Sequence, residues 1–139
     1  MPSITRFEDI QAWQTARELT QLVYALSNIG DFSRDFSLRD QMRRSAVSIM
    51  SNIAEGFESR TQSLFIEFLG RAKGSSGELR AQAYIAQDIG YIDHDRFHQL
   101  FNLTDKCSRQ IARFIQYLET QPNSRRIREE GIEYHVEPF

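Results

Sequence analysis

The sequence is poor in cysteine and in long apolar runs, and each shortage excludes a class of protein. Cys107 is the single cysteine among 139 residues, so no disulfide can form within the chain, which fits a reducing compartment. No apolar run approaches the roughly 20 residues that a membrane-spanning helix needs. The opening residues, MPSITRFEDI, have neither the basic flank nor the apolar stretch of a secretion signal. We therefore expect a soluble, cytoplasmic protein.

Net positive charge is also lacking. The chain has 17 basic and 19 acidic residues and a formal net charge of −2, so no global positive field would recruit nucleic acid. Only Lys73 and Lys106 are lysines, and the other basic residues are arginines, which suit planar, bidentate pairing with carboxylate or phosphate. Any nucleic-acid binding must therefore be local.

The alternation typical of strands is absent, whereas apolar residues recur every three or four positions in four segments. The expected helices cover about residues 6–28, 38–57, 61–89 and 94–120. Pro122 stops the last helix, so residues 122–139 are expected to form a charged tail and not a fifth helix. The sequence thus predicts an all-α protein, an antiparallel up-down-up-down four-helix bundle at residues 1–121 followed by a short C-terminal tail.

Polar caps and glycines mark the expected helix ends. The N-terminal signals are the capping-box pairs Thr5–Glu8 and Ser59–Gln62 and the single caps Ser37 and Asp93. Gly30 and Gly90 are expected to adopt the left-handed conformation that follows a helix.

A polar stripe runs beside the apolar face of the second helix. Its members are spaced three, four and three residues apart: Ser45, Ser48, Asn52 and Glu55. The middle of the third helix reads Gly74, Ser75, Ser76, Gly77. Each glycine there costs about 1 kcal/mol of helix stability relative to alanine, so something must compensate. Small residues would do so by letting two helix backbones approach closely.

We therefore expect a structural polar seam between the second and third helices, in which the Asn52 amide and the Glu55 carboxylate bond to hydroxyls, an arginine or exposed backbone. Its expected members are Ser48, Asn52, Glu55, Ser75 and Glu78, with Gln82 on the same face. The functional alternative makes Glu55 and Glu78 a carboxylate pair for acid–base or metal chemistry. Di-iron bundles need paired Glu-x-x-His motifs, which this chain lacks, so the structural interpretation is favoured.

Three segments carry a family resemblance: FEDIQAWQTARELTQLVYAL, LRDQMRRSAVSIMSNIAEGF and FLGRAKGSSGELRAQAYIAQDIGYI. They resemble the bacterial four-helix-bundle family of proteins encoded in 23S rRNA intervening sequences. The hallmark Asn-Ile-Ala-Glu-Gly motif matches Asn52 to Gly56. The Gly-Ser and Glu-Leu motif of the third helix matches Gly74, Ser75, Glu78 and Leu79.

That family is in turn similar to the accessory variability determinant of diversity-generating retroelements, a pentameric bundle that binds nucleic acid and a reverse transcriptase. The resemblance implies a homopentamer with no established enzymatic activity. This chain departs from the strongly basic accessory proteins, because its pI is about 5.9.

The densest basic cluster of the folded region stands at the start of the second helix and consists of Arg34, Arg39, Arg43 and Arg44. Because Asp35 and Asp40 offset it, one interpretation is a solvated helix face with ion pairs such as Arg39 or Arg44 to Asp40. The alternative is phosphate binding, since arginine clusters grip phosphate bidentately.

No set of catalytic or metal-ligating residues stands out in the sequence. His94 and His98 mimic a zinc motif but lack an obvious third ligand. Cys107 lies on the apolar stripe of the fourth helix, where a buried thiol is expected. We therefore expect no metal, no cofactor and no enzymatic activity.

Apolar residues outside the main stripes predict a homo-oligomer. The expected interface consists of side chains that a lone four-helix core should be unable to cover: Leu19, Leu22, Tyr24, Leu26, Phe101, Leu103 and Ile115. Closed cyclic symmetry is normal for identical subunits, and the number five comes only from the resemblance. The sequence thus favours a non-enzymatic oligomeric scaffold or adaptor for an unidentified protein partner, with an RNA- or DNA-binding module as the alternative.

Overall fold

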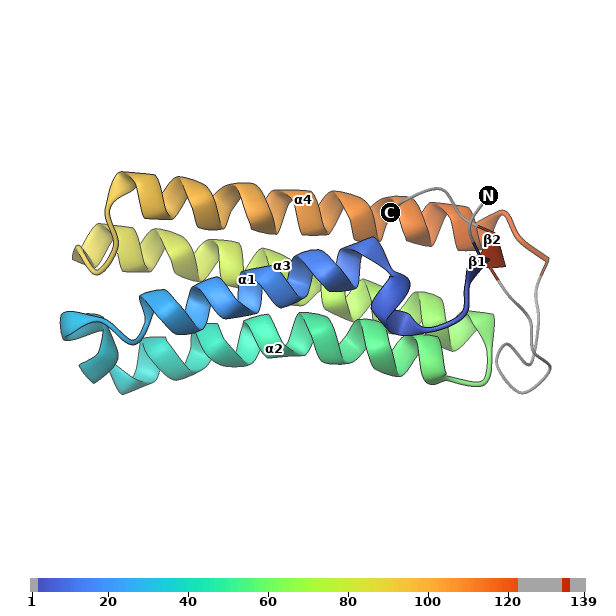
Figure 1. The fold of residues 1–139 in the computed structure, drawn as a ribbon, viewed down its shortest axis with the longest axis horizontal. Helices are drawn as coiled ribbons and strands as arrows, with labels where there is room; N and C mark the ends of the chain where they lie inside the picture. Colours follow the sequence, from blue (N-terminus) through green and yellow to red (C-terminus); the bar gives the residue numbers. More distant parts are fainter. Residues whose placement is uncertain (1–2, 123–133, 136–139) are drawn as a thin grey trace.

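The computed structural model describes residues 3–122 and 134–135, and it confirms the expected four-helix bundle (Figure 1). The helices are α1 (Gln11–Leu26), α2 (Phe36–Glu58), α3 (Gln62–Ile89) and α4 (His94–Glu119). They alternate in direction, and each packs on two neighbours, since α1 and α3 both contact α2 and α4. Along the described residues, no helix combines the length and apolar character that crossing a membrane requires.

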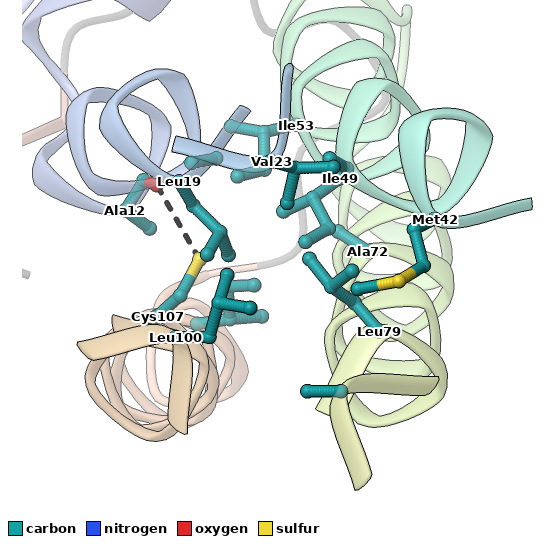
Figure 2. Close-up of a cluster of buried hydrophobic side chains, with 14 of the residues drawn as sticks. Ala12, Leu19, Val23, Met42, Ile49, Ile53, Ala72, Leu79, Leu100 and Cys107 are labelled. Carbon is teal, nitrogen blue, oxygen red and sulfur yellow. Dashed lines mark hydrogen bonds between the residues drawn. The ribbon is translucent and has the colours of Figure 1, made fainter. Parts of the chain in front are cut away.

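The core lies along the bundle axis, where all four helices contribute fully buried side chains. Figure 2 shows Leu19 of α1, Ile49 of α2, Leu79 of α3 and Leu100 of α4 converging on the space between the helices. Fully burying one such aliphatic side chain stabilises the fold by about 1.5–3 kcal/mol. The periodic apolar stripes therefore place the four helices as the sequence predicts.

The first helix begins later than predicted. Residues Phe7–Asp9 form a short 3-10 helix, η1, and Ile10 has an extended backbone (φ −73°, ψ 122°) before α1 starts. The predicted capping box at Thr5 and Glu8 is wrong, because the N-cap residues are Arg6 for η1 and Ile10 for α1, and neither makes a side-chain capping hydrogen bond. The bend at Ile10 lets this side chain bury itself completely, a gain that a continuous helix with a polar cap would forgo.

Two further caps differ from the prediction. The N-cap of α2 is Asp35 instead of Ser37, and that of α3 is Thr61 instead of Ser59; each accepts a backbone N–H of the first turn at 3.1 Å. Gln62, the expected capping-box partner, is buried and donates to a carbonyl at the end of α4 at 2.7 Å. Good N-cap residues stand close together at both places, so composition alone does not select among them.

The remaining end signals are confirmed. Asp93 caps α4 by accepting a backbone N–H at 2.8 Å, and Gly90 closes α3 with a left-handed backbone (φ 91°). Gly30 is also left-handed (φ 55°), but it begins a 3-10 helix, η2 (Gly30–Arg34), because Ser27 already ends α1.

The α1–α2 and α3–α4 turns lie at the same end of the bundle, on the left of Figure 1, which we call the connection end. They are joined there, because the Asp35 carboxylate accepts a hydrogen bond from the Tyr91 hydroxyl at 2.9 Å. The Tyr91 ring also stacks on Phe32 with 5.1 Å between ring centres. The hydrogen bond to Asp35 raises the pKa of Tyr91 above its usual range.

At the opposite end, β1 (Ser3–Ile4) and β2 (Tyr134–His135) form an antiparallel pair, with Ser3 opposite His135 and Ile4 opposite Tyr134. Ile4 is buried against the core. As predicted, α4 ends before Pro122. The rest of the predicted tail, residues 123–133 and 136–139, lies outside the described residues.

Candidate functional site

A polar seam joins α2 to α3. The hydroxyls of Ser48 and Ser75 form a hydrogen bond of 2.9 Å between the two helices. Asn52 donates its amide to the Ser48 carbonyl at 2.8 Å and to the Ser48 hydroxyl at 3.0 Å. Because the Ser48 oxygen accepts from Asn52, its own proton is available for Ser75. The family-motif asparagine thus orients the hydroxyl pair between the helices.

Two predicted members, Glu55 and Glu78, do not belong to this seam. Both are exposed, and within the described part of the chain neither makes a hydrogen bond or an ion pair. Three residues turn a helix by about 300°, so Glu55 lies about 60° around α2 from Asn52, on the solvent side. The prediction that the Glu55 carboxylate bonds within the seam is therefore wrong.

The glycines that allow close helix packing are also not the predicted ones. Gly74 and Gly77 are exposed, and a Cβ added at either would meet nothing within 4 Å. Gly56, the last residue of the Asn-Ile-Ala-Glu-Gly motif, is buried where α2 crosses α3. A Cβ there would lie 2.8 Å from Cβ of Phe68 and 2.9 Å from Cδ1 of Phe65. Gly56 is therefore the position at which close packing of α2 on α3 requires glycine.

The two serines between the exposed glycines serve different neighbours. Ser75 bonds to α2 through Ser48, whereas Ser76 is fully buried and donates to the Thr104 carbonyl of α4 at 3.0 Å. Ser108 of α4 donates to the Ser76 hydroxyl at 3.0 Å. Adjacent helix positions point about 100° apart, which is why a serine pair can bond to two helices. The sequence analysis did not predict this polar contact between α3 and α4, although two adjacent serines in the middle of a helix indicated it.

A polar groove of about 480 Å³ lies over the seam, between α2 and α3. Its lining includes both seam hydroxyls, the exposed charges Arg44 and Glu78, and Gln82. Gln82 is only 9 % exposed, and its Oε1 is fully buried with no hydrogen-bond partner in the described structure. The groove therefore combines hydroxyls, one charge of each sign and an unpartnered amide oxygen.

The fold agrees with the comparisons with known proteins. The family model described as 23S rRNA-intervening sequence protein matches residues 8–113, which include the seam. The chain belongs to the 23S rRNA-intervening sequence protein family. A similar solved structure is that of a protein of unknown function from the S23 ribosomal protein family of Bacteroides thetaiotaomicron, with a TM-score of 0.70 at 19% identity. The match covers 76% of this chain and 95% of that one. The search of curated proteins found no match.

Three of the four arginines in the predicted cluster of this family member already have partners. Arg34 pairs with Asp31. Arg39 pairs with Asp40 at 2.9 Å, as one interpretation of the sequence expected. Arg43 is the third, bonded to the Ser27 hydroxyl, and Arg44 is the exception.

Arg43 is half-buried and donates to the Ser27 hydroxyl at 2.8 Å, with its guanidinium 4.6 Å from the centre of the Tyr24 ring. Arg44 is exposed, and within the described residues it has no hydrogen-bond or ion-pair partner. The predicted cluster thus offers one unengaged guanidinium, and that group lines the α2–α3 groove.

The predicted oligomer interface of this family member needs correction. Leu19 and Leu26 are 0 % and 8 % exposed and belong to the monomer core. Four others are half-buried and pack on the core: Leu22, Phe101, Leu103 and Ile115. Of the predicted interface only Tyr24 is exposed, at 43 %. A single bundle covers most of these side chains because α1 and α4 each have two neighbouring helices.

Exposed apolar side chains gather instead at the connection end. Eight large apolar residues are exposed among those described, and six belong to the last turns of α1 and α3, the α1–α2 turn or the start of α2. These six, the connection-end patch, are Tyr24, Ile29, Phe36, Tyr84, Ile85 and Ile89. Val47 and Leu64 are the other two.

Cys107 and the histidine pair have ordinary structural surroundings. Cys107 is fully buried, its Sγ donates to the Ala12 carbonyl at 3.6 Å (Figure 2), and burial raises the pKa of its thiol to about 12. Such a thiol carries almost no thiolate at neutral pH. The rings of His94 and His98 meet edge to face, with 4.4 Å between their centres. Nowhere in the described ranges do three or more histidine, cysteine, aspartate or glutamate side chains gather to hold a metal ion.

Proposed function

We propose that this member of the 23S rRNA-intervening sequence protein family is a non-enzymatic, oligomeric scaffold or adaptor of the cytoplasm that binds a macromolecular partner. The connection-end patch carries the proposal. Ile29, Phe36 and Ile89 are 66 %, 62 % and 55 % exposed, and all three lie where two turns of the bundle meet. Exposed apolar side chains that gather in one region of a protein often mark a protein interface.

Among the described residues no catalytic set converges, which supports a binding role over an enzymatic one. The buried Cys107 thiol is held neutral, and the exposed Glu55 and Glu78 make no contact with a base or nucleophile within the described residues. A reaction site would need a nucleophile, a base and an oxyanion donor within hydrogen-bond reach of one another.

We assign the connection-end patch to the contact between copies of this chain. Identical subunits usually close into cyclic assemblies, and the patch holds six of the eight large apolar residues that are exposed among the described residues. The subunit number five remains an implication of the family resemblance.

Light scattering coupled to size-exclusion chromatography tests the assignment. We expect the wild-type protein to have an oligomeric mass, and the triple variant Ile29→Ser, Phe36→Ser, Ile89→Ser to have the mass of a monomer with an unchanged helical circular dichroism spectrum. The matched control is Val47→Ser, Leu64→Ser, which removes exposed apolar side chains elsewhere and should leave the oligomer intact. A wild-type monomer at micromolar concentration would contradict the proposal.

The partner is then sought by crosslinking in the native cell with wild-type protein and the triple variant side by side. A protein that crosslinks to the oligomer at defined residues supports the adaptor role. Turnover of a substrate by the purified protein would contradict the adaptor role and indicate an enzymatic one.

A further inference from the structure

The α2–α3 groove contains a side chain whose polar group has no partner. Gln82 is more than nine-tenths buried, and neither its Oε1 nor its Nε2 makes a hydrogen bond within the described residues. Exchanging the amide oxygen and nitrogen would only replace a buried unpartnered acceptor with a buried unpartnered donor. Buried polar atoms without partners are rare and costly, so this amide suits a ligand that both donates and accepts.

The rim of the groove carries two unpaired charges of opposite sign. Arg44 comes from α2 and Glu78 from α3; both line the groove, and neither forms an ion pair with the other or with any other described residue. A guanidinium binds a carboxylate bidentately, and a carboxylate binds an ammonium group. The rim therefore matches a small molecule that carries one carboxylate and one ammonium.

The spacing along α3 links the rim to the amide. Gln82 follows Glu78 by four residues, about one helical turn or 6 Å of rise. In free glutamine, the α-ammonium and the side-chain carboxamide lie a similar distance apart. Because Oε1 of Gln82 is fully buried, a ligand in the groove reaches it only once this side chain turns toward the groove. Two carboxamides can then pair through two reciprocal hydrogen bonds, which would satisfy both Oε1 and Nε2 of Gln82.

We propose that the α2–α3 groove binds a free α-amino acid with a side-chain carboxamide, such as glutamine. Its carboxylate lies on Arg44, its ammonium on Glu78, and its carboxamide pairs with Gln82. The hydroxyls of Ser48 and Ser75 bound the groove near the seam. The groove volume of about 480 Å³ lies within the range of small-molecule sites.

Isothermal titration calorimetry of the purified full-length protein with L-glutamine tests the site. We expect saturable binding of one ligand per chain. L-glutamate, which lacks the amide N–H donors, and N-acetyl-L-glutamine, which lacks the ammonium, should each bind at least tenfold more weakly. Absence of saturable heat at millimolar L-glutamine, or equal binding of the three compounds, would overturn the proposal.

Substitutions separate ligand binding from a structural role. Gln82→Met removes the unpartnered amide, so it should raise the melting temperature of the free protein while weakening glutamine binding at least tenfold. Gln110 is the matched control, because it is also 9 % exposed with an unpartnered buried Oε1, but it lines a different groove, beside α1. Gln110→Met should raise the melting temperature and leave glutamine binding unchanged.

The rim charges have their own control. Arg44→Gln and Glu78→Gln should each weaken binding at least tenfold, whereas Glu55→Gln, an exposed carboxylate outside the groove, should not. Retained binding in Gln82→Met, or a lower melting temperature of that variant without ligand, would show that Gln82 has another role and would refute the site.

Discussion

At the scale of single residues, Asn52 contributes to stability because it satisfies two acceptors of Ser48. Asn52→Ala should lower the free energy of unfolding by about 1 kcal/mol, the usual net contribution of a partly buried hydrogen bond. Urea denaturation measures the difference. Glu55→Ala is the control, since this exposed side chain has no partner in the described structure and should change stability by less than about 0.5 kcal/mol. Equal losses in both variants would contradict the seam described above.

Cys107 offers a chemical test of core burial. Its pKa of about 12, against an ordinary 9.0, lowers the thiolate fraction below pH 9 by about a thousandfold. The native protein at pH 8 should therefore react with a thiol reagent far more slowly than the urea-unfolded protein. Because the pKa of Cys107 is higher in the folded state, the contribution of its protonated thiol to the stability of the fold is complete below the unfolded pKa. That contribution is lost as pH rises toward 12. Rapid native-state labelling at pH 8 would show that the α1–α4 interface opens readily.

At the scale of helices, replacing two glycines by alanine should change the stability of the bundle in opposite directions. Gly56→Ala should destabilise the bundle by about 1–3 kcal/mol, because the new Cβ would overlap Phe68 and Phe65 and force α2 and α3 apart. Gly74→Ala should stabilise it by up to about 1 kcal/mol, because the position is helical, exposed and free of neighbours. Thermal melts of the two variants give the comparison. A destabilised Gly74→Ala variant would indicate that a partner covers this face of α3.

The contrast between these glycines shows what sequence periodicity can and cannot predict. Apolar spacing predicted all four helices and their order, because burial of those stripes dominates the energetics. It did not predict the rotation of α3 about its axis, which decides that Ser75 and Ser76 face neighbours while Gly74 faces solvent. It also missed the extended residue Ile10, where tertiary burial outweighs a local cap.

The candidate groove could be predicted only in part. Ser48, Ser75, Glu78 and Gln82 were expected on facing helices, but the sequence cannot show that the Gln82 amide lacks a partner. That property depends on the side chains of two helices at once. The prediction of the oligomer interface was wrong for a similar reason. The width of an apolar stripe on one helix does not show how many other helices cover it.

At the scale of the whole molecule, charge and pairing together predict weak nucleic-acid binding. The net charge is −2, and Arg34 and Arg39 are already ion-paired. Few counterions can therefore be released from a nucleic acid, so the salt dependence of affinity should be shallow. Titrations of labelled single- and double-stranded RNA and DNA at several salt concentrations measure it. Tight binding with a steep salt slope, lost in Arg43→Glu, Arg44→Glu, would establish the nucleic-acid alternative.

The hydrogen bond between Asp35 and Tyr91 has a consequence for how the bundle opens. It ties the start of α2 to the turn before α4, so local fluctuations of the two turns are thermodynamically coupled. Amide hydrogen exchange in these segments should share one opening free energy, and Tyr91→Phe should lower it, since the ring at position 91 still stacks on Phe32 but no longer bonds to Asp35. Because the folded pKa of Tyr91 is raised, this coupling is complete below the unfolded pKa and is lost as pH rises through the folded value. We therefore expect the two turns of the connection end to open together at neutral pH, and in strong alkali to be joined by the stacked rings of Phe32 and Tyr91 without the hydrogen bond to Asp35.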